Sequence, residues 1–272
     1  MKYIPKIPDG DVNKPKTSIL REFIFILFVL FLFIFIIYIC LGFVVDILVE
    51  KVPSDIEEII GYSYIKNFEG KRLTKKEIKL QKFLDELVSF TDMKNRKFKV
   101  RILETENVNA LAMPGGNIIV FSGLFKKINS ENQLAYVLSH ELGHFAHRDH
   151  LRAIGRGLIL SFISIVLFGA DNFYNKTMSK SLIGIQLKYT REQEKKADLF
   201  AVDLLNKKYK NVSGITDLLE KFGKYEQVPK SLTFFVTHPH YTDRIKIIQQ
   251  YIKNNNYKIT KEKSLDPIYK KN

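Results

Sequence analysis

The hydrophobic pattern of this chain is most extreme near its beginning. From Phe23 to Val45 the residues carry no charge and no proline. At about 1.5 Å per residue, this stretch reaches across a hydrocarbon core of roughly 30 Å. A cleaved secretory signal has a shorter apolar region, of about 7–15 residues, followed by small residues, and no such site follows Val45. The pattern therefore predicts a transmembrane anchor over residues 23–45 and not a buried core helix.

Beyond the anchor, apolar positions recur mainly at helical spacing. They predict a helix that begins near Pro53 and another over residues 75–90. Capping boxes predict the start of two further helices, at Ser130-Glu131-Asn132-Gln133 and Thr190-Arg191-Glu192-Gln193. In such a box the hydroxyl accepts from the backbone three residues on, while the glutamine reaches back. Most of the chain is therefore predicted to be helical.

Two shorter stretches have the pattern of strands. Residues 98–103 alternate between apolar and basic side chains, which is typical of a half-buried strand. Residues 117–121 follow the turn sequence Pro114-Gly115-Gly116 and are rich in β-branched residues. Neighbouring strands there would form a small sheet. The predicted fold class is α+β, a mainly helical domain with a small β-sheet, preceded by one transmembrane helix.

A second apolar stretch, Leu158 to Ala170, is too short to cross a bilayer as a single helix. Two interpretations remain open for it. It is either part of the core or an element that dips into the membrane surface.

Composition narrows the function classes. The chain has 272 residues and a formal net charge of +14, yet it has no zinc-finger spacing and no stripe of interleaved basic and aromatic residues, so we expect no nucleic-acid partner. A basic face beside an anionic membrane is the better interpretation. The single cysteine, Cys40, lies in the predicted anchor, so a thiolate metal cluster and an intrachain disulfide are both excluded.

The charges on either side of the anchor predict its orientation, because positively charged flanks stay in the cytoplasm. Five basic residues precede the anchor and only two follow it closely: Lys2, Lys6, Lys14, Lys16 and Arg21 before it, and Lys51 and Lys66 after it. We therefore expect a cytoplasmic tail over residues 1–22, the anchor over 23–45, and a domain over 46–272 on the outer face.

Candidate chemistry lies in the histidines. All six fall into two groups, His140, His144, His147 and His150 in one and His238 and His240 in the other. In the segment His140-Glu141-Leu142-Gly143-His144, the two histidines lie about 40° apart around a helix axis and can converge on one metal ion. Glu141 stands beside the first histidine, where its carboxylate can accept a proton from the attacking water.

A catalytic zinc needs a third protein ligand, and two residues compete for this role. His150 has the spacing of the metzincin signature, but that pattern needs a glycine where this chain has His147, so the helix should run on and carry His150 away. Glu194 and Asp198 lie four residues apart on the predicted helix after Thr190. Glu194 could bind the metal, while Asp198 accepts the free N–H of a ligand histidine. The small residues at 197 and 201 would let the two helices approach closely.

Four motifs in this order resemble one peptidase family. They are Val108-Asn109-Ala110-Leu111-Ala112-Met113-Pro114-Gly115-Gly116, then HELGH at 140–144, then Arg191-x-x-Glu194-x-x-Ala197-Asp198-x-x-Ala201, and Thr237-His238-Pro239 with Arg244-Ile245. The chain is similar, over roughly residues 52–250, to the HtpX-like and CAAX-prenyl-protease-like zinc metallopeptidases, metallopeptidase family forty-eight of the gluzincin group. With one clear membrane span, it is most similar to the single-anchor or periplasmic BepA-like and Oma-like members, and a role in prenyl processing is not expected.

The resemblance implies a role for each matching residue. The zinc ligands would be His140, His144 and Glu194, with one Zn²⁺ per chain, Glu141 as general base and Asp198 behind the ligands. His238 would lie near the metal, where it donates to the oxyanion of the tetrahedral intermediate or caps the zinc in a resting form. Substrate contacts are expected from an edge strand beside the cleft, at Asn109, Ala110 and Gly115, and from Arg244.

The sequence thus predicts a membrane-anchored zinc metalloendopeptidase. Zinc would polarise the scissile carbonyl, and Glu141 would take a proton from water and deliver it to the leaving amine. Polypeptides, in particular misfolded envelope or membrane proteins, are the expected substrates by analogy with the family. The alternative is a chaperone-like or scaffold protein of the same fold whose catalysis is silenced. An intramembrane protease is disfavoured, because HELGH is flanked by Ser139, Arg148 and Asp149.

Overall fold

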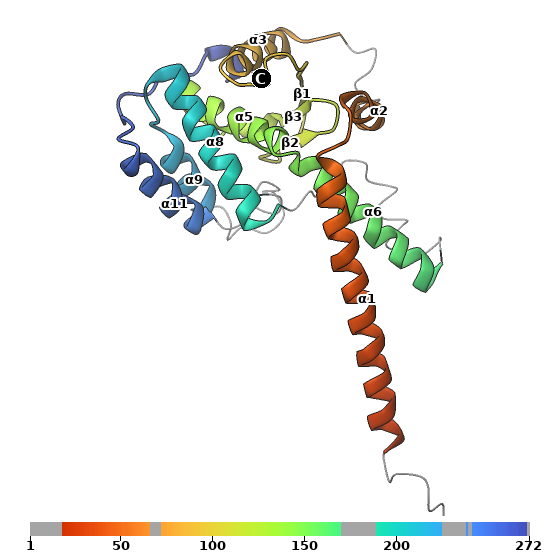
Figure 1. The fold of residues 1–272 in the computed structure, drawn as a ribbon. Helices are drawn as coiled ribbons and strands as arrows, with labels where there is room; N and C mark the ends of the chain where they lie inside the picture. The colour runs from red at the N-terminus through yellow and green to blue at the C-terminus, as the bar shows by residue number, and fades with distance from the viewer. Residues whose placement is uncertain (1–17, 66–71, 170–188, 225–237, 239–240, 271–272) are drawn as a thin grey trace, which may run out of the picture. The chain divides into compact units, whose positions relative to one another are not determined.

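The computed structural model describes residues 18–65, 72–169, 189–224, 238 and 241–270 (Figure 1). The chain divides after Val44 into two compact units, residues 1–44 and 45–272. In chain order the elements are α1 (Ile19–Val49), α2 (Ser54–Ile65), α3 (Lys75–Ser89), β1 (Lys99–Leu103), β2 (Ala110–Met113), β3 (Asn117–Phe121), α4 (Ser122–Phe125), α5 (Glu131–Ala146), α6 (Asp149–Phe168), α8 (Arg191–Tyr209), α9 (Ile215–Lys224), α11 (Tyr241–Asn254) and the 3₁₀ helix η2 (Pro267–Tyr269). The predicted class, mainly helical with a small sheet, is confirmed.

The described part of the first unit is residues 18–44, most of α1, and α1 contains the predicted anchor and extends beyond it at both ends. Its apolar side chains are exposed along its length, Phe23 at 57% and Phe43 at 68% among them. A helix that is apolar on all sides needs apolar surroundings. α1 therefore has the length and composition of a membrane-spanning helix.

The sheet has three strands in the order β1-β3-β2. β1 runs parallel to β3 with Lys99 opposite Asn117, whereas β2 runs antiparallel to β3 with Met113 opposite Asn117. The tight turn between β2 and β3 holds Gly115 and Gly116 at φ of 75° and 72°, which favours glycine. A side chain at Gly116 would also collide with the carbonyl oxygen of Lys97 at 2.3 Å. In the strand order, β2 is an edge strand beside β3, and β1 and β3 are the two strands that the sequence predicted.

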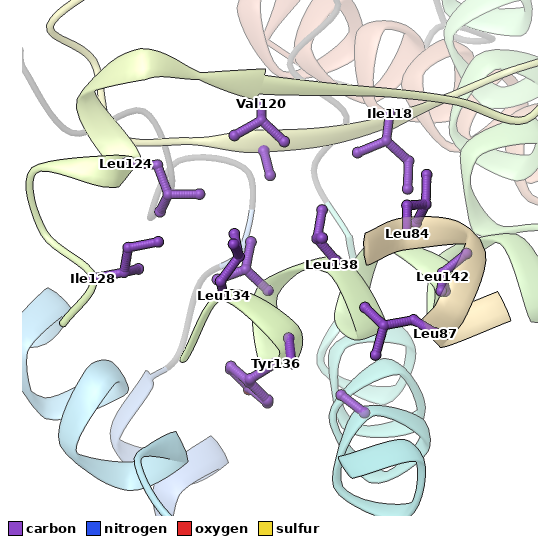
Figure 2. Close-up of a cluster of buried hydrophobic side chains, with 14 of the residues drawn as sticks. Leu84, Leu87, Ile118, Val120, Leu124, Ile128, Leu134, Tyr136, Leu138 and Leu142 are labelled. Carbon is purple, nitrogen blue, oxygen red and sulfur yellow. The ribbon is translucent and has the colours of Figure 1, made fainter. Parts of the chain in front are cut away.

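The core of the second unit lies between this sheet and α5. Figure 2 shows side chains of β3, such as Ile118 and Val120, pointing toward Leu134, Leu138 and Leu142 of α5, with α3 closing one side. These five side chains are at most 1% exposed. Because α5 presents its apolar face to the sheet, its opposite face is left to meet α8, which runs alongside it (Figure 1). α11 packs against α8 and α9, and α9 against α5.

α5 ends where the sequence predicted that it would continue. The helix stops at Ala146, and Arg148 turns the chain with a left-handed φ of 55°. The Arg148 guanidinium donates to the carbonyl oxygens of Val49 and Val52 at 2.9 and 2.7 Å, which ties this turn to the end of α1. The expectation that the helix runs on was therefore wrong.

His150 is nevertheless not among the residues whose ligand atoms converge. The turn at Arg148 places it in α6, where it is fully buried and its Nε2 lies 2.9 Å from Oε1 of Glu57. Glu57 also accepts from Arg96, with both oxygens at 3.0 Å, and from the backbone N–H of Gly115 at 3.3 Å. His150 thus belongs to a buried network that joins α2, α6 and the β2–β3 turn.

The second apolar stretch forms the distal half of α6. None of its described side chains is buried and most are exposed, with Leu158 at 65% and Phe162 at 62%. The interpretation of residues 158–168 as core is therefore wrong, and Ala170 lies outside the described residues. Since α6 begins at Asp149, it is longer than the apolar stretch alone. By length and composition, the whole helix is a candidate membrane span, as α1 is.

Candidate metal centre

α5 carries the first two histidines of the site on one face. Its start is capped by the Ser130 hydroxyl, which accepts from the backbone N–H of Gln133 at 3.1 Å. The Gln133 side chain accepts from the N–H of Asn129 and not from that of Ser130, so only half of the predicted box forms. The Nε2 atoms of His140 and His144 lie 3.1 Å apart, and both side chains are buried.

α8 brings in the carboxylate of Glu194. Its capping box is complete, since the Thr190 hydroxyl accepts from Gln193 N at 3.3 Å and the Gln193 side chain accepts from Thr190 N at 2.8 Å. Glu194 follows in the first turn, fully buried. Its Oε2 lies 3.5 Å from His140 Nε2, and its Oε1 lies 3.5 Å from His144 Nε2. Two capped helices thus present three ligand groups to one point.

The close approach of α5 and α8 depends on small residues where they cross. A side chain at Gly143 would bring its Cβ to 2.8 Å from the Cα of Ala197, which is closer than packed atoms approach. Ala197 and Ala201 are both fully buried. The predicted close contact is therefore confirmed at Ala197, with Gly143 on the facing helix as its partner.

This crossing leads to a prediction for Gly143→Ala. In an exposed helix, alanine is favoured over glycine by about 1 kcal/mol, but here the methyl group must push α8 away and carry Glu194 with it. We expect metal affinity to fall at least about tenfold, as it does when the support of a ligand is lost. The measurement is metal retained after dialysis against a competing chelator, with Ala146→Ser, at an exposed position of the same helix, as control. Unchanged affinity would mean that the helices adjust without moving Glu194.

His238 completes the cluster, 44 residues after Glu194. Its Nδ1 lies 3.2 Å from His140 Nε2 and 2.9 Å from Glu194 Oε1. Ligand atoms of His140, His144, Glu194 and His238 all lie within 4.8 Å of one another, and all four residues are buried. The neighbouring motif residues Thr237 and Pro239, and also His240, lie outside the described residues.

Glu141 lies beside this cluster with its carboxylate buried. Neither of its oxygens has a hydrogen-bond partner in the part of the chain that the structure describes. Oε1 lies 3.6 Å from Nε2 of His238. A buried carboxylate without partners costs several kcal/mol in an apolar interior, so its position calls for a cation or a proton donor that binds at the cluster.

Each of these two α5 histidines also has a carboxylate next to Nδ1, the ring nitrogen that does not face the cluster. Asp198 Oδ1 lies 2.9 Å from Nδ1 of His140, and Asp149 Oδ2 lies 3.0 Å from Nδ1 of His144. Both rings therefore turn Nε2 toward the cluster and Nδ1 toward an acid, an arrangement that orients metal-binding imidazoles. Asp198 was predicted for this position. Asp149 was not, because it comes after the end of α5 and only the turn at Arg148 brings it back.

Arg244 is buried against the carboxylates of Glu194 and Asp198 and does not lie at an open surface. It is 3% exposed, and its Nη1 lies 2.7 Å from Glu194 Oε2. It donates to both oxygens of Asp198, at 2.8 and 2.7 Å, and to the carbonyl oxygen of His238 at 3.3 Å. Tyr136 donates its hydroxyl to the same Asp198 at 2.7 Å. One guanidinium thus ties together three of the predicted site residues.

These contacts set the charge of the acids. Burial alone would raise the pKa of Asp198, but the Arg244 guanidinium and His140 lower that pKa to about 2. Burial likewise opposes the charge of Glu194, yet Arg244 and the nearby histidines hold its pKa well below the usual range. Both side chains are therefore carboxylates at neutral pH, as ligand and support roles require.

The same acids act on His144. Burial lowers the pKa of this imidazole, while the contacts with Asp149 and Glu194 raise it to about 9. The site therefore favours a positive charge at the His144 imidazole. Buried imidazole nitrogens and a carboxylate oxygen around one point are a donor set that suits zinc, so the residues present fit a divalent metal ion.

Tyr189, which the sequence motifs did not single out, covers one face of His144. The two rings are stacked with centroids 3.7 Å apart and an angle of 17° between their planes. Tyr189 belongs to a small apolar cluster on the far face of the sheet, together with Leu111, Phe121 and Ile154. No motif spacing marks it, since it follows a long connection from α6.

The residues predicted to contact substrate on the β2 side have different exposures. Asn109 and Ala110 are buried at the start of β2, where the Asn109 side chain accepts from the N–H of Ala110 at 2.9 Å. Gly115 is partly exposed in the turn after β2. β2 packs against α5 and pairs on one side with β3. Substrate contact at these positions stays a prediction.

Comparison with known proteins agrees with this geometry. The sequence profile of peptidase family M48 matches residues 74–252, which include both helices of the site and His238. The chain is 27% identical over 176 residues to the mitochondrial metalloendopeptidase OMA1 of Schizosaccharomyces pombe, an alignment that covers 64% of this chain and 52% of the relative.

Two bacterial proteins are similar to a comparable degree. The metalloprotease YcaL of Escherichia coli K12 is 30% identical over 164 residues, covering 56% of this chain and 61% of the relative. The beta-barrel assembly-enhancing protease of the same organism is 26% identical over 167 residues, covering 56% and 34%. The chain thus spans about half the length of the curated relatives it matches.

Proposed function

This chain belongs to peptidase family M48, and on that premise we propose that it is a zinc-dependent metalloendopeptidase anchored in a membrane by α1. One observation carries the proposal. The ligand atoms of two histidines on α5 and one carboxylate on α8 converge at a buried point, next to a glutamate whose carboxylate has no hydrogen-bond partner among the described residues.

His140, His144 and Glu194 would hold one Zn²⁺ per chain. When bound, zinc supplies Lewis-acid chemistry, which polarises a carbonyl and lowers the pKa of water in the site. The protein's own contribution is to keep these ligands oriented. Asp198 and Asp149, which lie 2.9 and 3.0 Å from the Nδ1 atoms, would orient the two imidazoles, and Arg244 would position Glu194 and Asp198 through its guanidinium.

Glu141 would act as the general base. Its buried carboxylate accepts a proton from the attacking water and later delivers it to the leaving amine of the cleaved peptide. His238 stands opposite, with Nε2 3.6 Å from Glu141 Oε1. There it can donate to the oxyanion of the tetrahedral intermediate. The contact of His238 Nδ1 with Glu194 also supports a resting form in which this imidazole occupies the metal site.

An extended substrate would lie along β2. An edge strand can add a peptide through main-chain hydrogen bonds, and β2 lies at one end of the strand order. Asn109 and Ala110 would mark one end of this contact and Gly115 the other. For Arg244 the buried position favours an indirect role, since it touches the groups that hold the metal and has 3% exposure.

The expected substrates are misfolded proteins of a membrane or cell envelope. This proposal rests on the names of the relatives, among which are a mitochondrial metalloendopeptidase and a beta-barrel assembly-enhancing protease. The resemblance covers the domain common to them and only part of their length. Quality control of membrane proteins is therefore the proposed role, with polypeptides as the substrate class.

Metal removal is the direct test of this function. The purified full-length chain is expected to contain zinc and to cleave unfolded casein. Dialysis with a chelator should abolish cleavage, and zinc should restore it where magnesium does not, because imidazole ligands favour zinc over magnesium. Cleavage by metal-free protein would refute the proposal. A zinc-loaded chain that binds casein without cleaving it would favour the silenced, chaperone-like alternative.

We also propose the orientation that the flanking charges predict, with residues 1–22 in the cytoplasm, 23–45 in the membrane and 46–272 on the outer face. An alkaline phosphatase fused after residue 272 is expected to be active in a bacterial host, because this enzyme folds only where disulfides form. A fusion after residue 22 is the control and should be inactive. The opposite pattern would reverse the orientation.

A further inference from the structure

The distal half of α6 carries no charge and exposes apolar side chains around most of its circumference. From residue 157 to 168 the helix carries no charged residue, and none of these side chains is buried. At 3.6 residues per turn, the most exposed positions point in all directions around the axis, and they are Leu158, Leu160, Phe162, Ile165, Val166, Leu167 and Phe168. A helix that docks on a protein partner has one apolar stripe, whereas a helix apolar all round belongs in a core or in lipid.

The proximal half of α6 is different. Asp149, His150, Leu151 and Ile154 are buried in the second unit, and Arg152 and Arg156 are the charged residues that follow Asp149. The helix is therefore divided at residue 156. Its first half is part of the folded domain, and its second half extends out of it.

Ion pairs place this division at a definite level. Arg156 lies 2.8 Å from Asp46, and Arg152 contacts both Asp46 and Glu50. Asp46 is the first charged residue after the uncharged stretch 23–45, and Arg156 is the last before the uncharged stretch 157–168. The charged residue that follows one uncharged stretch thus pairs with the charged residue that precedes the other, and these ion pairs form a band of charges that belongs at a membrane surface.

The direction of α6 follows from the same contacts. Arg152 meets Glu50, Arg156 meets Asp46, and a side chain at Gly155 would collide with Val45 at 2.6 Å. As numbers rise along α6, they fall along the partner segment, so the two run antiparallel. Beyond Arg156, α6 therefore continues past Asp46, away from Glu50, and carries no further charge.

We infer that residues 157–168 of α6 insert into the bilayer, starting from the band of charges at Arg156 and Asp46. At about 1.5 Å per residue this half extends about 18 Å, which is enough for one leaflet of a core roughly 30 Å thick but not for both. The occupant of this surface is lipid. Because Asp149, which contacts His144, begins the same helix, the metal centre is held about two turns, or about 11 Å along the axis, from the membrane surface.

This position also bears on the substrate, a step that rests on the proposed peptidase function. A cleft held at the membrane surface would act on polypeptide segments close to the bilayer. A peptide tethered to a lipid should therefore be cleaved faster than the same peptide free in solution, and Phe162→Glu should reduce this preference without changing cleavage of the free peptide. Equal rates for tethered and free peptide would refute this substrate preference and leave the lipid contact to be judged by the following measurement.

The contact with lipid is tested without any activity. The full-length chain with Cys40→Ser is reconstituted in vesicles of phosphatidylcholine and phosphatidylglycerol, with a single cysteine introduced as Phe162→Cys and labelled with an environment-sensitive fluorophore. Ile259→Cys is the matched control, since Ile259 is also an apolar residue of the second unit and is 66% exposed. We expect blue-shifted emission at position 162 that lipids with a spin label on the acyl chain quench, and no such change at 259.

The possible outcomes separate the occupants of this surface. Emission at 162 as red as that at 259 would mean that the helix lies in water and would overturn the inference. Blue-shifted emission that acyl-chain spin labels do not quench would mean that protein covers the helix, a second copy of the chain included, and would also overturn it. Leu160→Cys, about 160° around the helix axis from position 162, must behave like Phe162→Cys, and zinc content checks that each variant is folded.

Discussion

Replacing Glu141 with glutamine is expected to lower kcat for peptide cleavage by about 10²–10⁴-fold, the range that a positioned general base contributes. Glutamine has nearly the same shape, so packing of α5 against the sheet is retained. What is lost is the ability to accept a proton from water. Because Glu141 is not one of the four residues whose ligand atoms converge, zinc content should stay the same.

A matched control for this variant is Glu192→Gln. Glu192 is a glutamate of α8 two residues before a proposed ligand, but its side chain is 64% exposed, and we expect its loss to leave kcat unchanged. Measurement of zinc content and of casein cleavage for the three proteins decides the role. If Glu141→Gln cleaved as fast as the unmodified chain, Glu141 would not be the base and the proposed mechanism would fail.

Replacing Glu194 with alanine is expected to remove the metal and the activity together. Loss of an outer partner of a ligand costs about 10–100-fold in metal affinity, and loss of the ligand itself should cost more. The change also leaves the Arg244 guanidinium without its 2.7 Å contact to Glu194, so a positive charge would face the two histidines. Both effects oppose binding of a cation.

His150 provides the comparison for Glu194, because its spacing from His140 made it the competing third ligand. We expect His150→Gln to keep its zinc, since the imidazole lies against Glu57 and glutamine can still donate to that carboxylate. Thermal unfolding of both variants shows whether the fold is retained. Zinc retained in Glu194→Ala and lost in His150→Gln would reverse the assignment of the third ligand.

Several features of the site follow from the sequence because they depend on residues no more than four apart. The spacing of His140 and His144 on a helix brings their imidazoles to one face, and their Nε2 atoms lie 3.1 Å apart. The hydroxyls of Ser130 and Thr190 cap α5 and α8 as predicted. Local hydrogen bonds and helical periodicity form within one segment, so a sequence pattern is enough to identify them.

The length of the anchor also depends only on residues that are close together in the sequence. A run without charge from Phe23 to Val45 has to be a long helix in an apolar environment, and α1 extends beyond it only by the residues that complete its end turns. The small residues Ala197 and Ala201 also indicated a close helix crossing. Their partner Gly143 became visible only when the two helices were seen together.

Other features were decided by the tertiary structure. A chain reversal at Arg148 decides the position of His150, the contact of Asp149 with His144 and the start of α6. The left-handed backbone of Arg148 is held by contacts with the end of α1, nearly a hundred residues earlier. Arg244 was predicted to meet substrate, yet its charge is taken up by Asp198 and Glu194 on another helix. The sequence by itself determined which segments are helical and which residues can bind a metal, because these are short-range properties. Which of those residues meet was decided by packing between segments far apart in the chain.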